Sequence, residues 1–181
     1  MNNLSRRGVA TAATVLATAA VSLTWAASSA SAATAMHNGP FPACSASNLE
    51  VRVGSVHGTP HSHDVTYSLD FSNTSRYACT LRGYPENVGA ADYRGHRIGL
   101  PAARIPGAPS SPVVLMQGQT AHSRLVYNPD ALRAHGCRPT YSALLVAGLP
   151  ESGQPARANF SQEVCSGHVV DLSIGQLQQG A

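Results

Sequence analysis

Four cysteines constrain the fold of this 181-residue chain more than any other feature: Cys44, Cys79, Cys137 and Cys165. No two of them form a Cys-x-x-Cys pair, so their spacing argues against a zinc site built from four thiolates. An even number of cysteines in a small exported domain is typical of two disulfides, which support a core too small to be very stable alone. The sequence therefore predicts two disulfide bonds if the chain reaches an oxidising compartment.

The N-terminal residues indicate that compartment. Arg6 and Arg7 precede a long run rich in Ala, Val, Leu and Thr, and Ala30-Ser31-Ala32 follows the run. Charge, apolar run and small residues in this order are typical of a secretory signal peptide cleaved after Ala32. The alternative is an uncleaved anchor, but Ala and Thr make the run only weakly apolar. We expect a signal peptide over residues 1–32 and a secreted protein, exported by the general or the twin-arginine route.

Cleavage leaves a chain whose charge is nearly balanced. All twelve basic residues are arginines and two leave with the signal, so ten arginines face nine acidic residues, a net charge of +1. This balance gives no patch suited to nucleic acid. Trp25, the only tryptophan, also lies in the signal, so the mature domain lacks the core tryptophan of antibody domains. We expect a monomer with no nucleic-acid partner, no cofactor and no membrane span after signal cleavage.

Alternating apolar residues predict strands. Val65, Tyr67, Leu69 and Phe71 alternate with polar residues, as do Leu49, Val51 and Val53. Eight or nine short strands separated by turn signals are typical of a β-sandwich. We predict an all-β, two-sheet, immunoglobulin-like β-sandwich with two disulfides. The expected organisation is a flexible segment at 33–43, the sandwich domain at 44–175 and a polar tail at 176–181. Tyr141–Leu149 is expected to be one buried strand, and Pro101–Pro112 a loop.

This layout favours one disulfide pairing among three. Cys44 lies just before the first predicted strand and Cys79 just after the second, so an antiparallel hairpin brings them to the same end. Cys137 and Cys165 bracket another group of strands in the same way. We predict the pairs Cys44–Cys79 and Cys137–Cys165.

One stretch of sequence resembles a known family. The motifs are Phe71-Ser72-Asn73-Thr74 and Cys79-Thr80-Leu81-Arg82-Gly83-Tyr84-Pro85, with Gly118-Gln119-Thr120-Ala121 before a later strand. In these motifs the chain resembles the exported actinobacterial domain of unknown function 4232 (DUF4232), from about Cys44 to Leu172. The resemblance implies a secreted or envelope-attached β-sandwich with the disulfides above, and it implies no reaction. Many relatives carry a lipid-attachment cysteine after the signal, and the absence of one here favours a released protein.

The densest group of candidate ligands lies between two predicted strands. His57, His61, His63 and Asp64 fall within eight residues, and three imidazoles with a carboxylate suit Zn²⁺ or Cu²⁺. The plainer interpretation is an exposed hairpin loop in which histidine is tolerated. A metal site also needs supporting groups around the ligands, which a sequence does not reveal.

No reactive motif stands out elsewhere. The chain lacks Gly-x-Ser-x-Gly and His-Glu-x-x-His, and it has no lysine for a Ser-x-x-Lys pair. We therefore expect a non-enzymatic binding module whose partner is an extracellular protein or an envelope component. One alternative is metal binding through the His57–Asp64 loop. A second is protease inhibition through the proline-rich loop 101–112, since exposed loops on rigid sandwiches often carry recognition.

Overall fold

The computed structural model describes residues 41–58, 63–149 and 154–180, all within the compact unit Thr34–Ala181. The predicted signal peptide, residues 1–32, lies outside these ranges. Strands predominate in the described part, and its only helices are the short 3-10 turns η1 (Ala46–Asn48) and η2 (Pro129–Arg133). Neither turn approaches the length and hydropathy of a membrane-crossing helix.

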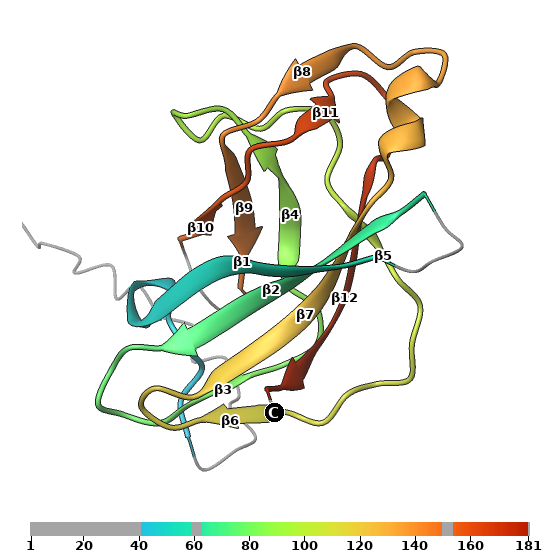
Figure 1. Cartoon of the computed structure of the whole chain (residues 1–181). Coiled ribbons are helices and arrows are strands. Elements are labelled where there is room, and N and C mark those ends of the chain that lie inside the picture. Colours follow the sequence, from blue (N-terminus) through green and yellow to red (C-terminus); the bar gives the residue numbers. More distant parts are fainter. Residues whose placement is uncertain (1–40, 59–62, 150–153, 181) are drawn as a thin grey trace, which may run out of the picture. The chain divides into compact units, whose positions relative to one another are not determined.

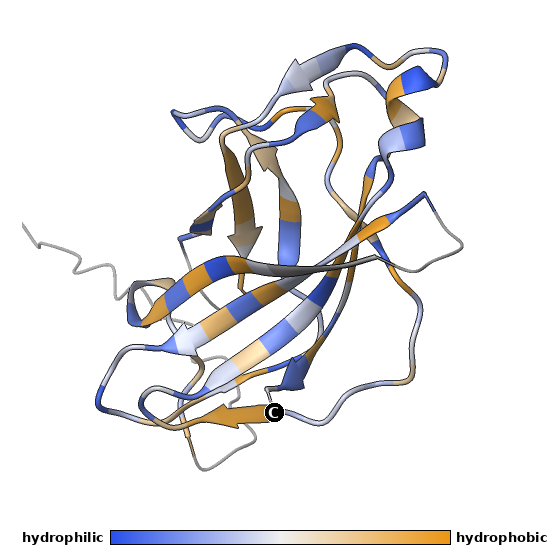
Figure 2. Cartoon of the chain, viewed as in Figure 1, coloured by the Kyte–Doolittle hydropathy of each residue, from blue (hydrophilic) through white to orange (hydrophobic). Residues whose placement is uncertain are grey.

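The largest layer is a five-stranded sheet (Figure 1). In spatial order it contains β1 (Leu49–Gly58), β2 (Val65–Asn73), β7 (Thr120–Tyr127), β12 (Leu172–Gln179) and β5 (Ala103–Arg104). The pairs β1–β2, β2–β7 and β7–β12 are antiparallel, whereas β5 pairs parallel to β12. The alternating bands along β1, β2 and β7 in Figure 2 follow from the two-residue repeat of a strand with one buried face.

Shorter sheets make up the rest of the sandwich. One contains β10 (Ala156–Asn159), β9 (Leu144–Gly148) and β4 (Glu86–Ala91), in that order. Two further pairs are β3 (Cys79–Leu81) with β6 (Val113–Leu115), and β8 (Pro139–Tyr141) with β11 (Glu163–Cys165). Gly83, with a φ of 64°, separates β3 from β4 because few other residues adopt that backbone conformation. The all-β sandwich prediction is confirmed, with its second layer divided into several short sheets.

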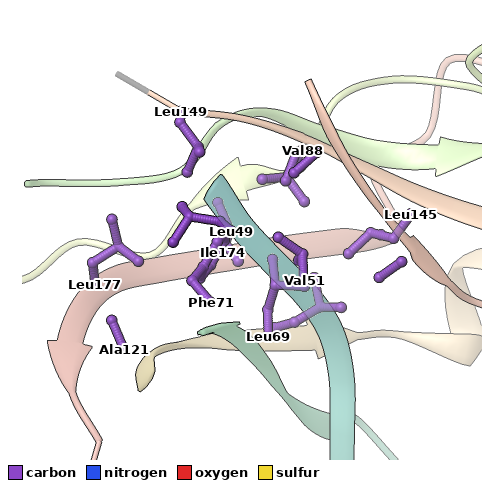
Figure 3. Packing of buried hydrophobic residues seen from close by; sticks show 14 of the residues in the cluster. Leu49, Val51, Leu69, Phe71, Val88, Ala121, Leu145, Leu149, Ile174 and Leu177 are labelled. Atoms are coloured by element: carbon purple, nitrogen blue, oxygen red, sulfur yellow. The ribbon is translucent and has the colours of Figure 1, made fainter. Parts of the chain in front are cut away.

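The hydrophobic core lies between these layers. Figure 3 shows Leu69, Phe71 and Ile174 of the large sheet facing the side of the core that holds Val88 of β4 and Leu145 of β9. Each of these five side chains is buried to 99% or more. Burying a large aliphatic or aromatic side chain stabilises the fold by roughly 1.5–3 kcal/mol, so this core holds the two layers together.

Both predicted disulfides are confirmed. Cys44 is bonded to Cys79 and Cys137 to Cys165, with Cα–Cα distances of 4.9 Å and 5.2 Å. The β1–β2 hairpin is antiparallel and pairs Leu49 with Asn73, so the residues flanking it end close together, as the sequence argument required. Cys79 begins β3 and Cys165 ends β11, and Figure 1 places these two strands at opposite ends of the domain.

The boundaries of the sandwich differ from the prediction. Strand β12 runs to Gln179, so residues 176–179 belong to the sheet, and the prediction of a polar tail from 176 is wrong for them. Leu177 is fully buried and anchors this last stretch. At the other end, Ala43 forms a parallel bridge with Thr80, so the segment 33–43 is tied to β3 at its end. The neighbouring Cys44–Cys79 bond holds these two backbones together.

The single strand predicted at Tyr141–Leu149 is two strands. The amide of Ser142 donates to the carbonyl of Gln162 (2.9 Å), and its hydroxyl donates to the carbonyl of Phe160 (2.7 Å). These bonds turn the chain between β8 and β9 and place the two strands in different sheets. Tyr141 is 78% exposed for this reason, although an uninterrupted buried strand was expected.

Candidate functional site

The histidine-rich segment connects β1 to β2. His57 is in β1, where its backbone is paired with Thr66, and its side chain lies outside the described part of the structure, as does all of His61. His63 and Asp64 directly precede β2. Within the ranges that the structure describes, no three His, Cys, Asp or Glu side chains gather as a metal site would require. The four predicted ligands therefore remain a prediction, with His63 the one whose contacts are seen.

His63 has a partner that sequence reasoning missed. Its Nδ1 lies 2.6 Å from Oδ2 of Asp130, although the two residues are 67 positions apart. Asp130 is fixed at the start of η2, where its amide donates to the side chain of Asn128 (2.9 Å), and Arg133 lies 3.4 Å from its other oxygen. A carboxylate that accepts from Nδ1–H leaves Nε2 of the ring available as an acceptor or metal ligand. The imidazole is 83% exposed, so Nε2 faces solvent.

The prediction that the proline-rich segment 101–112 is a loop throughout is wrong at Ala103–Arg104, which form β5 and pair with β12. The rest of the segment, called loop 101–112 below, is held at several points of its backbone. The hydroxyl of Tyr84 donates to the carbonyl of Ile105 (2.6 Å), and the Gln176 amide donates to the carbonyl of Gly107 (3.2 Å). The amide of Ser110 in turn donates to the side-chain oxygen of Gln176 (2.6 Å). Gln176 belongs to the stretch predicted to be a polar tail, so its role here was also missed. The loop is thus ordered by side chains from two other segments of the chain.

A shallow groove of about 450 Å³ lies beside this loop. Ile105, Pro106 and Ser110 line it on the loop side, and Arg124 and Gln178 line it on the sheet side. Arg124 lies in β7 next to the bulge of β12, where a Cβ on Gly175 would lie 3.4 Å from the Cβ of Arg124. The groove combines one exposed cation with amide groups and an apolar rim, which suits recognition better than covalent chemistry.

Asn73, in the motif Phe71-Ser72-Asn73-Thr74, has a structural role. Asn73 is fully buried, and its amide nitrogen donates to the carbonyls of Tyr77 (2.8 Å) and Leu115 (2.9 Å). Its side-chain oxygen accepts the amide of Ser75 (2.9 Å). Asn73 therefore joins the turn after β2 to strand β6, and each polar atom of its side chain is satisfied, as burial requires.

A buried acidic group lies near the second disulfide. Asp171 is 5% exposed, and its Oδ2 accepts the amide of Cys165 (2.7 Å). Burial raises the pKa of the Asp171 carboxyl, and the Cys165 amide acts in the opposite direction. Burial likewise raises the pKa of Tyr127, with Asp171 and Glu163 adding to the effect, and the Tyr127 hydroxyl donates to the carbonyl of Glu163 (2.6 Å). These polar groups are occupied by backbone partners, which assigns them to the fold.

The family of the chain follows from a match to a protein-family model. A family model described as "Domain of unknown function (DUF4232)" matches residues 44–178. The chain belongs to the DUF4232 family. No curated protein and no solved structure is significantly similar to it.

The DUF4232 match covers the β-sandwich except for the last residue of β12. It begins at Cys44, the first disulfide cysteine, and ends at Gln178 within β12. The family description carries no activity, so a function has to be argued from the side chains described above. The two disulfides of this DUF4232 domain indicate an oxidising, non-cytoplasmic compartment.

Proposed function

We propose that the mature protein is a secreted, non-enzymatic binding module that recognises an extracellular protein or a component of the cell envelope. The observation that carries the proposal is the ordering of loop 101–112 by Tyr84 and Gln176. A loop that is already ordered loses less conformational entropy when a partner binds. In this proposal the N-terminal signal sequence exports the chain to an oxidising compartment, which accounts for the two disulfides. The exported protein is a monomer.

The test is capture of surface and secreted proteins on immobilised mature protein, residues 33–181. We expect the wild-type domain to retain a specific partner and Gln176→Ala to lose it, because the backbone at Gly107 and Ser110 then loses its hydrogen bonds to Gln176. Gln179→Ala is the matched control, since Gln179 is an exposed glutamine of the same strand that lies outside the groove. No partner on the wild-type domain, or equal capture by both variants, would contradict the proposal.

A second candidate is binding of Zn²⁺ or Cu²⁺ by the His57–Asp64 segment. The His63–Asp130 pair favours it, because a metal-binding imidazole usually donates its other ring N–H to a carboxylate. Calorimetry with each metal should show heat for the wild-type protein and none for His61→Ala with His63→Ala. Asp130→Asn should weaken binding about 10–100-fold, whereas His168→Ala should not change it. Absence of heat from the wild-type protein would end this candidate.

The third candidate, protease inhibition, also uses loop 101–112. An ordered, exposed loop with Pro106 near its centre suits tight binding in the active site of a protease, because little conformational entropy is lost when it binds. A panel of secreted serine, cysteine and metalloproteases tests it, with uninhibited hydrolysis in every case as the contradicting result.

A further inference from the structure

Two strands of the sandwich have a free edge on the same side of the domain. β1 is the outermost strand of the five-stranded sheet and β10 the outermost strand of the β10–β9–β4 sheet. Figure 1 shows β10 beside β1, and a groove of about 610 Å³ runs between them. Val51 and Val53 line it on one side, and Arg157, Ala158 and Asn159 line it on the other.

The backbone of β1 offers hydrogen-bonding groups to this groove. The amide of Thr74 donates to the carbonyl of Asn48 (2.9 Å), so the pair 48–74 is hydrogen-bonded and the pairs of Val51 and Val53 with β2 fall on the alternate, non-bonded positions. The amide and carbonyl groups of Val51 and Val53 therefore point away from β2. Among the described residues, no backbone group pairs with them across the free edge.

Strand β10 presents its edge in the same way. The amide of Phe160 donates to the carbonyl of Ala143 (3.0 Å), which places Arg157 and Asn159 on the alternate positions of the β9–β10 ladder. Their side chains are exposed, whereas those of Ala156 and Ala158, which alternate with them along the strand, are buried. The groove thus has an apolar floor, polar side chains at its rim and unpaired backbone groups along its length. An extended peptide can use all three features by adding a strand to the edge.

The charge of the rim selects the side chains of such a peptide. Glu50 and Arg52 form an ion pair at 2.6 Å and neutralise each other. Arg157 has no carboxylate partner in the described part of the chain, and its guanidinium carbon lies 2.9 Å from where a Cβ at Gly95 would be. The groove therefore carries an unbalanced positive charge, which favours acidic side chains in the ligand.

The turn from Asp92 to His96, whose Gly95 lies beside the Arg157 guanidinium, extends the same surface. The Asp92 carboxylate accepts the amides of Arg94 (2.9 Å) and His96 (2.8 Å) and so fixes the turn. The tip presents Tyr93, which is 72% exposed, with the Arg94 guanidinium 5.2 Å from the centre of its ring. Tyrosine and arginine held in fixed positions are the residue types that most often dominate binding energy at interfaces.

We propose that the groove between β1 and β10 binds an extended peptide segment with acidic side chains, supplied by the partner protein. The segment adds a strand along Val51 and Val53, its apolar residues face the floor, and its carboxylates bind the guanidinium groups of Arg157 and Arg94. The alternation of side chains along a strand lets one peptide satisfy both faces. This inference rests on the proposed binding function and names the chemistry of the ligand.

The first experiment measures fluorescence anisotropy of a labelled peptide of alternating valine and glutamate with the mature protein. We expect binding that weakens with salt, and no binding by the same peptide with lysine in place of glutamate. A glutamate peptide N-methylated at alternate residues, so that its groove-facing amides cannot donate, should also fail to bind. Equal binding of the methylated peptide would overturn the added strand, and binding of the lysine peptide would overturn the role of charge.

Variants of the protein test whether its arginines contribute to binding of the glutamate peptide. Arg157→Ala should weaken binding of the glutamate peptide about tenfold. Arg76→Ala is the control, because Arg76 is an arginine outside the groove, with its guanidinium 5.8 Å from the ring centre of Tyr77. Unchanged affinity of Arg157→Ala would overturn the proposal. If the mature protein still captures a partner through loop 101–112 while no glutamate peptide binds, this inference fails and the proposed binding function stands.

Discussion

At the scale of single residues, the burial of Asp171 makes the stability of the fold depend on pH. Its carboxyl is nearly excluded from solvent, and burial raises its pKa above the ordinary value of 3.8. A raised pKa in the folded state means that the neutral form is favoured by folding. The stability gained from the neutral carboxyl is complete below the unfolded value and is lost as pH rises through the folded value. Ionised Asp171 therefore opposes folding near neutral pH.

Asp171→Asn should remove this pH dependence. The asparagine keeps an oxygen that accepts the amide of Cys165 but does not ionise. We expect the free energy of unfolding of the wild-type protein to fall as pH rises above about 4, the ordinary pKa of an aspartate, and that of the variant to fall less. Urea unfolding followed by circular dichroism measures both. Parallel curves for the two proteins would show that the carboxyl of Asp171 does not titrate in this range.

The pKa of the Asp92 carboxyl is shifted in the opposite direction to that of Asp171. The amide of His96 is the largest cause of a lowered pKa of its carboxyl. Burial opposes it, and the amide of Arg94 and the His96 side chain lower the pKa further. A lowered pKa means that the charged form is favoured by folding, so its contribution is present above the unfolded value and is lost as pH falls through the folded value. Asp92→Asn should accordingly lessen the loss of stability in acid, measured by the same urea series. A steeper loss in the variant would contradict the assigned hydrogen bonds.

At the scale of elements, alternation predicted β1 and β2 well, but it missed β5 and joined β8 and β9 into one strand. Tyr67, Leu69 and Phe71 are buried as the pattern in Val65–Phe71 indicated. The break at Ser142 depends on acceptors in the segment 160–162, and the extension of β12 depends on its pairing with β7. Such partners are distant in the sequence and leave no local pattern. The same reason explains why His63 was a candidate from sequence and Asp130 was not.

Loop 101–112 allows a prediction at this scale. Tyr84→Phe removes the hydroxyl that donates to Ile105 and leaves the ring in place under Arg104, whose guanidinium lies 5.3 Å from the ring centre. Loss of one such hydrogen bond costs about 1 kcal/mol. Because the bond ties down a loop and no core element, we expect faster amide exchange in residues 105–110 and little change elsewhere. Hydrogen exchange measured by mass spectrometry distinguishes this from uniform acceleration, which would assign Tyr84 to the global core.

At the scale of the whole molecule, the disulfide pairing was predictable and the arrangement of the layers was predictable only in outline. The pairing followed from chain order, since each pair of cysteines brackets strands that pair with one another nearby. The division of the second layer into three short sheets depends on turns at Gly83 and Ser142, whose effect is decided by tertiary partners. The peptide proposal depends on the free edge of β1 in the large sheet and on that of β10 in one of these short sheets.

Removing the disulfides tests the molecule as a whole. The bonds close loops of 35 and 28 residues, for which the chain-entropy model gives roughly 3.5–4 kcal/mol each. They lie at opposite ends of the domain, so the losses from Cys44→Ala with Cys79→Ala and from Cys137→Ala with Cys165→Ala should add. The sum, about 7 kcal/mol, is comparable with the net stability of a typical domain. We therefore expect each double variant to fold with reduced urea resistance and the quadruple variant to be largely unfolded. A quadruple variant that retains cooperative unfolding would mean that the core between the layers suffices, and that this domain does not need an oxidising compartment in order to fold.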